Sequence, residues 1–205
     1  MPFKTEQESF WHGEFGTEYI DRNKSQFIIA SNLNFFSKIL ASTRNVSSIV
    51  EFGCNVGLNL IAFRQLKPDI NLCGVEINPH AVSELKKWGG CQVIEDSILE
   101  MEISGKWDLS FTKGVLIHIN PEYLSVVYKK LYDASRKYIL VAEYYNPTPV
   151  AVKYRGHDDR LFKRDFAGEI MDQYLDLELV EYGFVYRNDP NFPQDDLTWF
   201  LLKKK

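Results

Sequence analysis

A glycine-containing turn lies between a β-branched run and a stretch with helical apolar spacing. Ile49 and Val50 lead into the turn, Gly53-Cys54-Asn55-Val56-Gly57, and the helical pattern begins at Leu58. A second apolar run follows and ends on the carboxylate of Glu76. Strand, tight turn, helix, strand and acidic residue, in this order, are the parts of a βαβ unit that binds a nucleoside.

The spacing of the glycines discriminates among nucleoside ligands. A dinucleotide site uses G-x-G-x-x-G, but here Asn55 stands at the second glycine and Leu58 at the third. Glycine and asparagine both tolerate positive φ, so the turn stays tight while it offers a poorer cradle for phosphate. The chain also lacks a G-x-x-x-x-G-K-[ST] run. These residues favour a cofactor with adenosine and no phosphate, which is S-adenosylmethionine.

The turn resembles motif I, E/D-x-G-x-G-x-G, of the class I S-adenosylmethionine-dependent methyltransferases. Glu51 supplies the acid of the motif, and Asn55 is its one departure. The resemblance extends over roughly residues 47–202 and implies an α/β, Rossmann-like fold. The implied sheet has seven mostly parallel strands in the order 3-2-1-4-5-7-6, with strand seven antiparallel and helices on both faces.

The resemblance also implies which residues hold the cofactor. Glu76 would accept two hydrogen bonds from the ribose hydroxyls, with a surface acid as the alternative. Asp96 would contact the adenine amine, unless it caps the following helix, a role that Ser97 could also fill. Glu51 would lie near the methionine amino group or orient the amides of the turn. Further cofactor contacts are expected at Gly53, Asn55, Gly57, Ile77, Ile98 and Thr112.

Five short apolar runs predict the parallel strands, at 48–52, 72–77, 92–95, 107–112 and 138–143. Ligands of an open α/β sheet bind outside the carboxyl ends of the strands, so the candidate residues should share one edge. Asn78-Pro79 and Asn120-Pro121 predict helix starts. Two further strands, at 177–187 and 197–202, predict a terminal hairpin. We expect one domain over residues 1–205, with an irregular arm (1–23), a core (24–205) and an insertion (144–163).

A hydroxyl acceptor would benefit from a general base, and three residues are candidates. His118 follows the fourth strand, where an acceptor could approach, although a histidine packed beneath the edge is an equal alternative. Glu143 ends the fifth strand and could instead make a structural hydrogen bond to the arm. His157 lies in the insertion.

The arm and the insertion are rich in residues that bind ligands. In the arm, Trp11 would contact the substrate, and Tyr19 and Arg22 would bind the methionine carboxylate. The alternative is an aromatic plug on the first helix; otherwise the arm is a lid that excludes water. In the insertion, substrate contacts are expected at Tyr144, Tyr145, Arg155, Arg160 and Lys163. The cations suit a phosphate or carboxylate on the acceptor, although mixed charge runs are most often solvated.

These two segments and residues 112–119 resemble the pseudaminic acid biosynthesis-associated methylases, over nearly the whole chain. The resemblance implies O-methylation of a nonulosonic or related sugar, free or nucleotide-linked, in surface-glycan synthesis. Two alternatives are N-methylation of a small amine or peptide, and a non-catalytic protein that binds S-adenosylmethionine.

The composition of the chain narrows the classes of ligand and of cellular compartment that we expect. A net charge of −4 argues against a large nucleic-acid footprint. Three cysteines without a C-x-x-C pair suggest a reducing compartment, with no disulfide and no metal site. The first residues lack an apolar signal core, and no run reaches membrane-spanning length. We therefore expect a cytoplasmic enzyme that acts on a small molecule.

Overall fold

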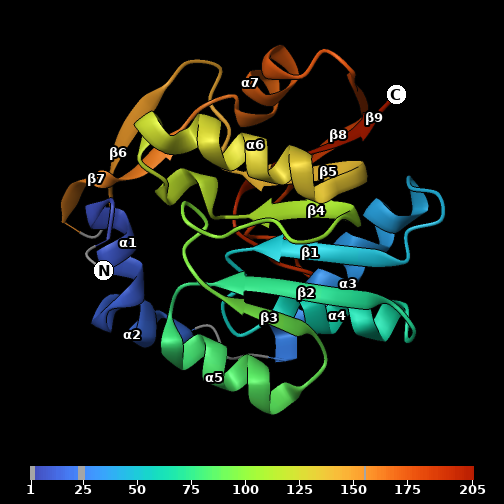
Figure 1. The fold of residues 1–205 in the computed structure, drawn as a ribbon, viewed down its shortest axis with the longest axis horizontal. Coiled ribbons are helices and arrows are strands. Elements are labelled where there is room, and N and C mark those ends of the chain that lie inside the picture. Colours follow the sequence, from blue (N-terminus) through green and yellow to red (C-terminus); the bar gives the residue numbers. More distant parts are fainter. Residues whose placement is uncertain (1–2, 23–25, 155) are drawn as a thin grey trace.

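The computed structural model of the chain describes residues 3–22, 26–154 and 156–205, without the side chains of residues 21, 22 and 157–159. A seven-stranded sheet forms its centre, in the order β3-β2-β1-β4-β5-β9-β8 (Figure 1). These strands are β1 (Ser48–Phe52), β2 (Asn71–Glu76), β3 (Gln92–Glu95), β4 (Trp107–Lys113), β5 (Ser135–Glu143), β8 (Leu177–Val185) and β9 (Leu197–Lys204). β9 runs antiparallel to β5 and β8, and the pairs from β3 to β5 are parallel. The predicted fold class and strand order are confirmed.

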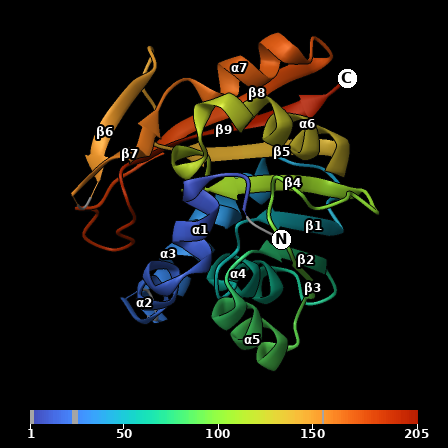
Figure 2. The ribbon, with the colours of Figure 1, turned by 60° about the vertical axis from the view of Figure 1, so that its left-hand side comes forward.

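Helices cover both faces of the sheet (Figures 1 and 2). α3 (Gln26–Ala41) and α4 (Leu58–Leu66) pack on one face around Phe36, Phe63 and Phe111. α6 (Leu124–Ala134) and α7 (Phe166–Gln173) pack on the other face. All five residues of β1 are buried, because a parallel strand covered on both faces has no solvent side.

The start of α5 (Pro79–Trp88) follows directly from the sequence. Asn78 accepts hydrogen bonds from the amides of His80 and Ala81, and Pro79 occupies the first helical position. The helix ends at Gly89, whose φ of 68° is readily adopted by glycine. Asn120 acts differently from the prediction, because it caps a 3-10 turn, η2 (Pro121–Tyr123), which then continues into α6.

Two segments differ from their predictions. The arm is helical rather than irregular, and consists of α1 (Glu6–His12) and α2 (Glu14–Arg22). Thr5 and Glu8 form a reciprocal capping box at the start of α1. The insertion contains a two-stranded antiparallel sheet, β6 (Val150–Tyr154) and β7 (His157–Lys163). Figures 1 and 2 show the arm and this hairpin beyond the carboxyl ends of β1, β2 and β4.

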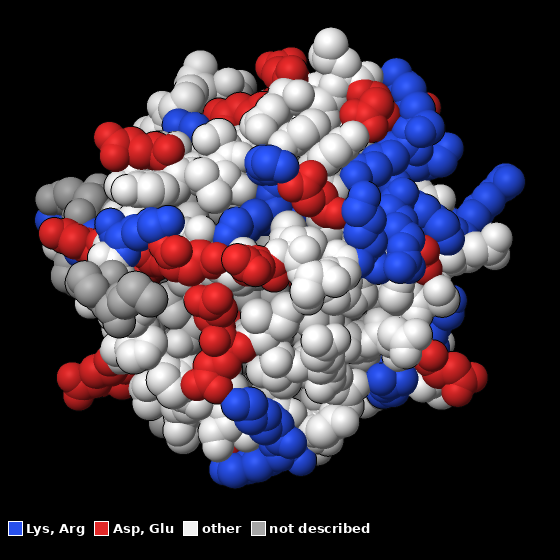
Figure 3. All heavy atoms as spheres, in the orientation of Figure 1, with Lys and Arg blue, Asp and Glu red and all other residues white. Residues whose placement is uncertain are grey.

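On the face seen in Figure 3, the largest group of Lys and Arg side chains lies toward the C-terminus. Burial and then the nearby ammonium of Lys106 lower the pKa of Lys204. Side chains of both signs lie nearer α1 and α2. Along the described chain, no helix combines the length and apolarity needed to cross a bilayer.

Candidate active site

The turn after β1 adopts a left-handed backbone at three positions. φ is 75° at Gly53, 49° at Asn55 and 79° at Gly57. A β-carbon on Gly57 would lie 2.5 Å from Cδ2 of Leu85, so this position needs glycine for space as well as for conformation. Asparagine tolerates positive φ, which explains how Asn55 preserves the turn.

Glu76 connects this turn with the start of α5. One carboxylate oxygen accepts a hydrogen bond from the amide of Asn55 at 2.7 Å, and the other accepts from the amide of Asn78 at 2.8 Å. Burial raises the pKa of Glu76, while these two bonds and one from Ile77 oppose the rise. Each carboxylate oxygen can accept a second hydrogen bond, so the side chain can still receive a diol.

A cavity of about 770 Å³ opens at the carboxyl ends of the strands, and its size is that of a small-molecule site. Of the residues that the sequence identified, these line it: Trp11, Tyr19, Gly53, Asn55, Glu76, Ile77, Ser97, Ile98, His118 and Tyr144. Residues identified from segments more than 100 positions apart thus meet at one cavity.

Other predicted residues lie elsewhere. Among the described residues, those outside the cavity lining are Glu51, Gly57, Asp96, Thr112, Glu143, Tyr145, Arg160 and Lys163. Arg155 and the side chains of Arg22 and His157 lie outside the described part of the chain. Asp96 is exposed and accepts a hydrogen bond from the adjacent amide of Ser97. Residues 98–100 form a turn and not the helix that the capping alternative required, and the hydroxyl of Ser97 accepts from the amide of Leu99.

One corner of the cavity holds buried polar atoms that lack hydrogen-bond partners. The donors there are Nδ2 of Asn32, which has no partner, and Nζ of Lys113, which donates to Oδ1 of Asn32 at 3.3 Å. The acceptors are Oε2 of Glu51 and Oε1 of Gln194, and neither has a partner. Since a buried polar group without a partner is costly, these atoms indicate a polar ligand with both a negative and a positive group.

Glu51 lies directly beneath this corner. Its other oxygen accepts a hydrogen bond from Nδ2 of Asn59 at 2.5 Å, and Asn59 lines the cavity. Burial raises the pKa of Glu51 to about 8, and the hydrogen bond from Asn59 and the ammonium of Lys113 only partly oppose this. A cationic ligand group at Oε2 would favour the carboxylate.

The opposite end of the cavity is more apolar. Ile77 and Ile98 line it beside Ser97, whose hydroxyl donates a short hydrogen bond to Glu8 of α1. A flat ring such as adenine suits two aliphatic walls with a hydroxyl at their edge. An adenosyl group at this end and a charged amino-acid group at the other match the two ends of S-adenosylmethionine.

His118 occupies η1 (Leu116–His118), after β4, and its tautomer is determined by one contact. Nδ1 lies 2.7 Å from the backbone carbonyl oxygen of Arg160 in β7, and a carbonyl can only accept. Nδ1 therefore carries the proton, and Nε2 keeps its lone pair. Burial lowers the pKa of His118 to about 4, so the ring is neutral at neutral pH. The rings of Trp11 and Tyr154 pack against it, at 4.8 and 5.1 Å between centroids.

Glu143 supports the same loop from below. Its buried carboxylate accepts hydrogen bonds from the amides of Val115 and Leu116 at 3.1 Å and of Ile117 at 3.5 Å. Burial raises its pKa to about 7 despite these bonds. The side chain thus orients the loop that carries His118, and it does not line the cavity.

The arm closes one side of the cavity. Asn78 donates from Nδ2 to the carbonyls of residues 11, 12 and 13 at 3.1–3.4 Å, and to Oγ1 of Thr17. Arg160 forms an ion pair with Glu6 at 3.0 Å and packs over the ring of Phe10. The cation that was expected to meet substrate instead joins the hairpin to α1. Lys163 lies over the ring of Tyr144, at 5.2 Å from its centroid.

Solved structures resemble the chain closely in fold and weakly in sequence. Magnesium protoporphyrin IX methyltransferase from Synechocystis, with bound S-adenosylhomocysteine, superposes with a TM-score of 0.69 at 13% identity, over 97% of this chain and 98% of that one. A 1,6-didemethyltoxoflavin-N1-methyltransferase from Burkholderia thailandensis gives 0.71 at 14% identity, over 100% and 92%. The mitomycin 7-O-methyltransferase gives 0.70 at 10% identity, over 98% and 61%. The chain has the class I methyltransferase fold.

Neither a scan against protein-family models nor a search of curated proteins gave a match. Several residues that line the cavity were not identified as ligand contacts from the sequence: Asn32, Lys113, Gln194 and Asp195. One signal was available, because Asn32 is a polar residue that lies three and four positions before the buried Phe35 and Phe36, and therefore on the buried side of α3. Lys113 directly follows the predicted fourth strand and so had to lie at its carboxyl end.

Proposed function

We propose that this protein transfers a methyl group from S-adenosylmethionine to a hydroxyl of a small molecule. The observation that carries the proposal is the corner where Nδ2 of Asn32, Oε2 of Glu51 and Oε1 of Gln194 have no partner, beside the ammonium of Lys113, which contacts Oδ1 of Asn32. Donors match the α-carboxylate of the methionyl group, and acceptors match its α-ammonium. Together with Glu76 at the expected ribose position, this set fits the whole cofactor.

The bound cofactor would supply an activated methyl group, so the protein has mainly to align the acceptor with it. Alignment in a near-attack geometry contributes about 7–11 kcal/mol in well-oriented systems. Hydrogen bonds from Asn78 to Glu76 and to the arm fix one side of the cavity. The bond from Val115 to Glu143 fixes the other side. α1 and α2 cover the cavity and exclude water, which would otherwise weaken the polar contacts between the protein and its ligands.

His118 is the proposed general base. Nε2 is its free acceptor, because Nδ1 donates to the carbonyl of Arg160. This arrangement lets Nε2 take a proton from an acceptor hydroxyl while the carbonyl stabilises the ring in its orientation. Glu143 acts through the loop and is a positioning residue.

The proposed acceptor is a sugar or a nucleotide-linked sugar. Trp11, Tyr144 and Tyr154 give the cavity aromatic walls, against which the apolar face of a pyranose can stack. Arg187 lines the cavity and could meet an acidic group on the sugar. The family resemblance noted from the arm and the insertion supports the same class.

Calorimetry with S-adenosylhomocysteine tests cofactor binding. Glu76→Ala removes two charge-assisted hydrogen bonds and should weaken binding by at least about 100-fold. Glu95→Ala is the matched control, because Glu95 is the exposed register partner of Glu76 on β3. Its affinity should stay within about twofold of the original protein. Binding of NAD or ATP in this cavity, with S-adenosylhomocysteine ignored, would overturn the proposal.

A methyl-labelled cofactor and a panel of sugars, nucleotide sugars, amines and peptides test the acceptor. A methyl ether on a sugar is the expected product. Label on nitrogen would replace the O-methylation proposal with N-methylation. Cofactor binding without turnover on any panel member would favour a binding protein and contradict the catalytic role of His118.

A further inference from the structure

β8 is a long edge strand of the central sheet. The two edges are β3, with four residues, and β8, with nine, and no strand of the described chain pairs on the outer side of β8. Proteins usually shorten, charge or cover such an edge, because its unpaired amides and carbonyls attract another strand. Most of β8 is exposed, yet it carries only the charges Glu178 and Glu181. A register shift against β9 at residues 179–181 interrupts the first part of the strand, so residues 181–185 are the part left open to pairing.

One face of this edge is aromatic. Tyr182 is 66% exposed and Phe184 58%, and their register partners on β9 are Phe200 and Thr198. The ring of Phe200 lies 6.2 Å from that of Tyr182 and 5.9 Å from that of Tyr145. Because register partners point to the same side of a sheet, these rings form one continuous surface. An exposed apolar patch of this kind marks an interaction site.

We propose that β8 pairs antiparallel with β8 of a second copy of this chain, with the two-fold axis at Gly183. Tyr182 then faces Phe184 of the partner subunit, and the same pair forms again on the other side of the axis. The edge is thus complementary to itself, which is the condition for a closed two-fold interface. Aromatic cross-strand pairs also stabilise antiparallel strands.

The charges on β8 agree with this register. With the axis at Gly183, Glu181 faces Val185 of the partner subunit. An axis at Glu181 would bring two glutamates together, and like charges directly opposite are destabilising. The glycine itself leaves the axis free of side chains on the face where Trp199 lies, since a β-carbon there would approach the Trp199 ring to 2.8 Å.

Pairing at β8 would reach the proposed active site. β8 leads into the connection at 186–196, where Arg187, Gln194 and Asp195 line the cavity. An ion pair joins Arg187 to Asp196 across the ends of this connection. A partner strand that holds β8 would therefore stabilise one wall of the cavity. The proposed dimer itself does not require that the protein be a methyltransferase.

The test is sedimentation equilibrium of the full chain over a concentration series, with three variants. The unaltered protein should be a dimer. Tyr182→Lys combined with Phe184→Lys sets like charges opposite each other and should raise the dimer dissociation constant at least about tenfold. Tyr182→Glu combined with Phe184→Lys sets opposite charges across the same axis and should remain dimeric, with affinity that falls as salt is added. Val126→Lys, at an exposed position of α6, is the matched control and should not change the dimer.

A monomeric unaltered protein overturns the proposal, and so does a dimer that survives the Lys/Lys variant. A monomeric Glu/Lys variant overturns the register. Both positions are exposed, and unchanged thermal unfolding of each variant shows that a loss of dimer is not a loss of fold. Hydrogen exchange gives a second readout, because β8 amides should become more protected as the concentration of the unaltered protein rises.

Discussion

Nδ1 of His118 lies 2.7 Å from the carbonyl oxygen of Arg160, a residue 42 positions later in the chain. This contact joins the loop after β4 to the hairpin β6–β7. It leaves Nε2 as the acceptor of a ring that burial keeps neutral. Since the contact uses a backbone carbonyl, substitution of the Arg160 side chain does not remove it.

The first prediction concerns the pH dependence of activity. Burial lowers the pKa of His118 to about 4, so the ring stays unprotonated above that pH. If His118 is the base, kcat/KM for the acceptor, measured with S-adenosylmethionine at saturation, should be flat from pH 8 to pH 5 and fall only near pH 4. A base with the ordinary histidine pKa of about 6.5 would lose activity already below that value. His118→Asn should lower kcat by about 10²–10⁴-fold. His80→Asn, at an exposed position of α5, is the control, and an equal effect of both variants would contradict the role.

A second prediction follows from the pKa of Glu51, which burial raises to about 8. At pH 7 the group is mostly protonated, and an ammonium bound at Oε2 would lower its pKa. Binding of S-adenosylhomocysteine at pH 7 should therefore release up to about one proton. Calorimetry in buffers with different ionisation enthalpies measures this number. Glu51→Gln should remove the release, and the difference between the two proteins separates Glu51 from any proton taken up at Lys113. Identical proton counts would show that Glu51 does not meet the ammonium.

The third prediction tests the contact between Asn78 and the arm. Asn78→Asp keeps an oxygen to cap α5 but removes the donor that binds the carbonyls of residues 11–13. Loss of this donor against buried acceptors costs about 1–3 kcal/mol, so amides of α1 and α2 should exchange roughly 5–150 times faster. Dissociation of S-adenosylhomocysteine should accelerate as well. Asn120→Asp is the matched control, because Asn120 caps η2 in the same way. Unchanged exchange in α1 and α2 would mean that other contacts hold the arm.

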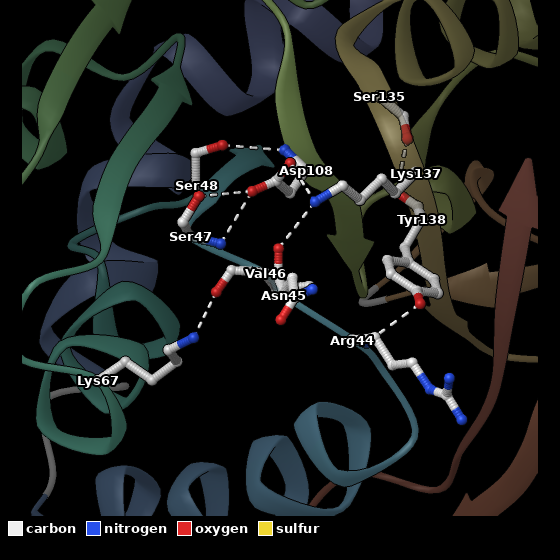
Figure 4. Close-up of polar contacts among 10 residues, drawn as sticks. All are labelled: Arg44, Asn45, Val46, Ser47, Ser48, Lys67, Asp108, Ser135, Lys137 and Tyr138. Carbon is white, nitrogen blue, oxygen red and sulfur yellow. Dashed lines mark hydrogen bonds and ion pairs between the residues drawn. The ribbon is translucent and has the colours of Figure 1, made fainter.

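The fourth prediction concerns stability at the other end of the strands, where Figure 4 shows Asp108 between β1 and β5. Its carboxylate accepts from the amide and hydroxyl of Ser47 at 2.8 and 2.7 Å and pairs with Lys137 at 3.0 Å. Burial opposes ionisation, but these groups outweigh it and lower the pKa of Asp108 to about 2. A lowered pKa stabilises the fold above the unfolded-state pKa of about 4, and the effect disappears as the pH falls through 2.

Asp108→Asn should therefore reduce the free energy of unfolding by about 2 kcal/mol at pH 7. The difference should shrink between pH 4 and pH 2. Urea titrations at several pH values measure it. Asp133→Asn, which breaks an exposed pair with Lys129, should cost less than about 0.5 kcal/mol. Equal losses for both variants would contradict the account of Asp108.

Several features were predictable from the sequence because their causes are local. A parallel strand that is covered on both faces appears as a continuous apolar run, so β1 was predicted at its observed bounds. β3, a partly exposed edge strand, was also predicted at its observed bounds. The positive φ of the turn requires residues such as Gly53 and Asn55, and the cap of α5 requires Asn78 next to Pro79. Because parallel strands of an open sheet present their carboxyl ends to one side, the position of Glu76 at the cavity was also determined by the sequence alone.

Other features depended on contacts between distant residues, and only the tertiary structure decided them. α1 and α2, with seven and nine residues, are too short to be stable alone, so their helical form depends on packing and on the contacts of Asn78. Lys113 meets Asn32 across 81 positions, and no local pattern specifies such a pair. Glu143 ends β5 as predicted, but whether its carboxylate enters the cavity or holds a loop depends on which unpaired amides lie nearest. The three amides of residues 115–117 lie there, and they determine its role.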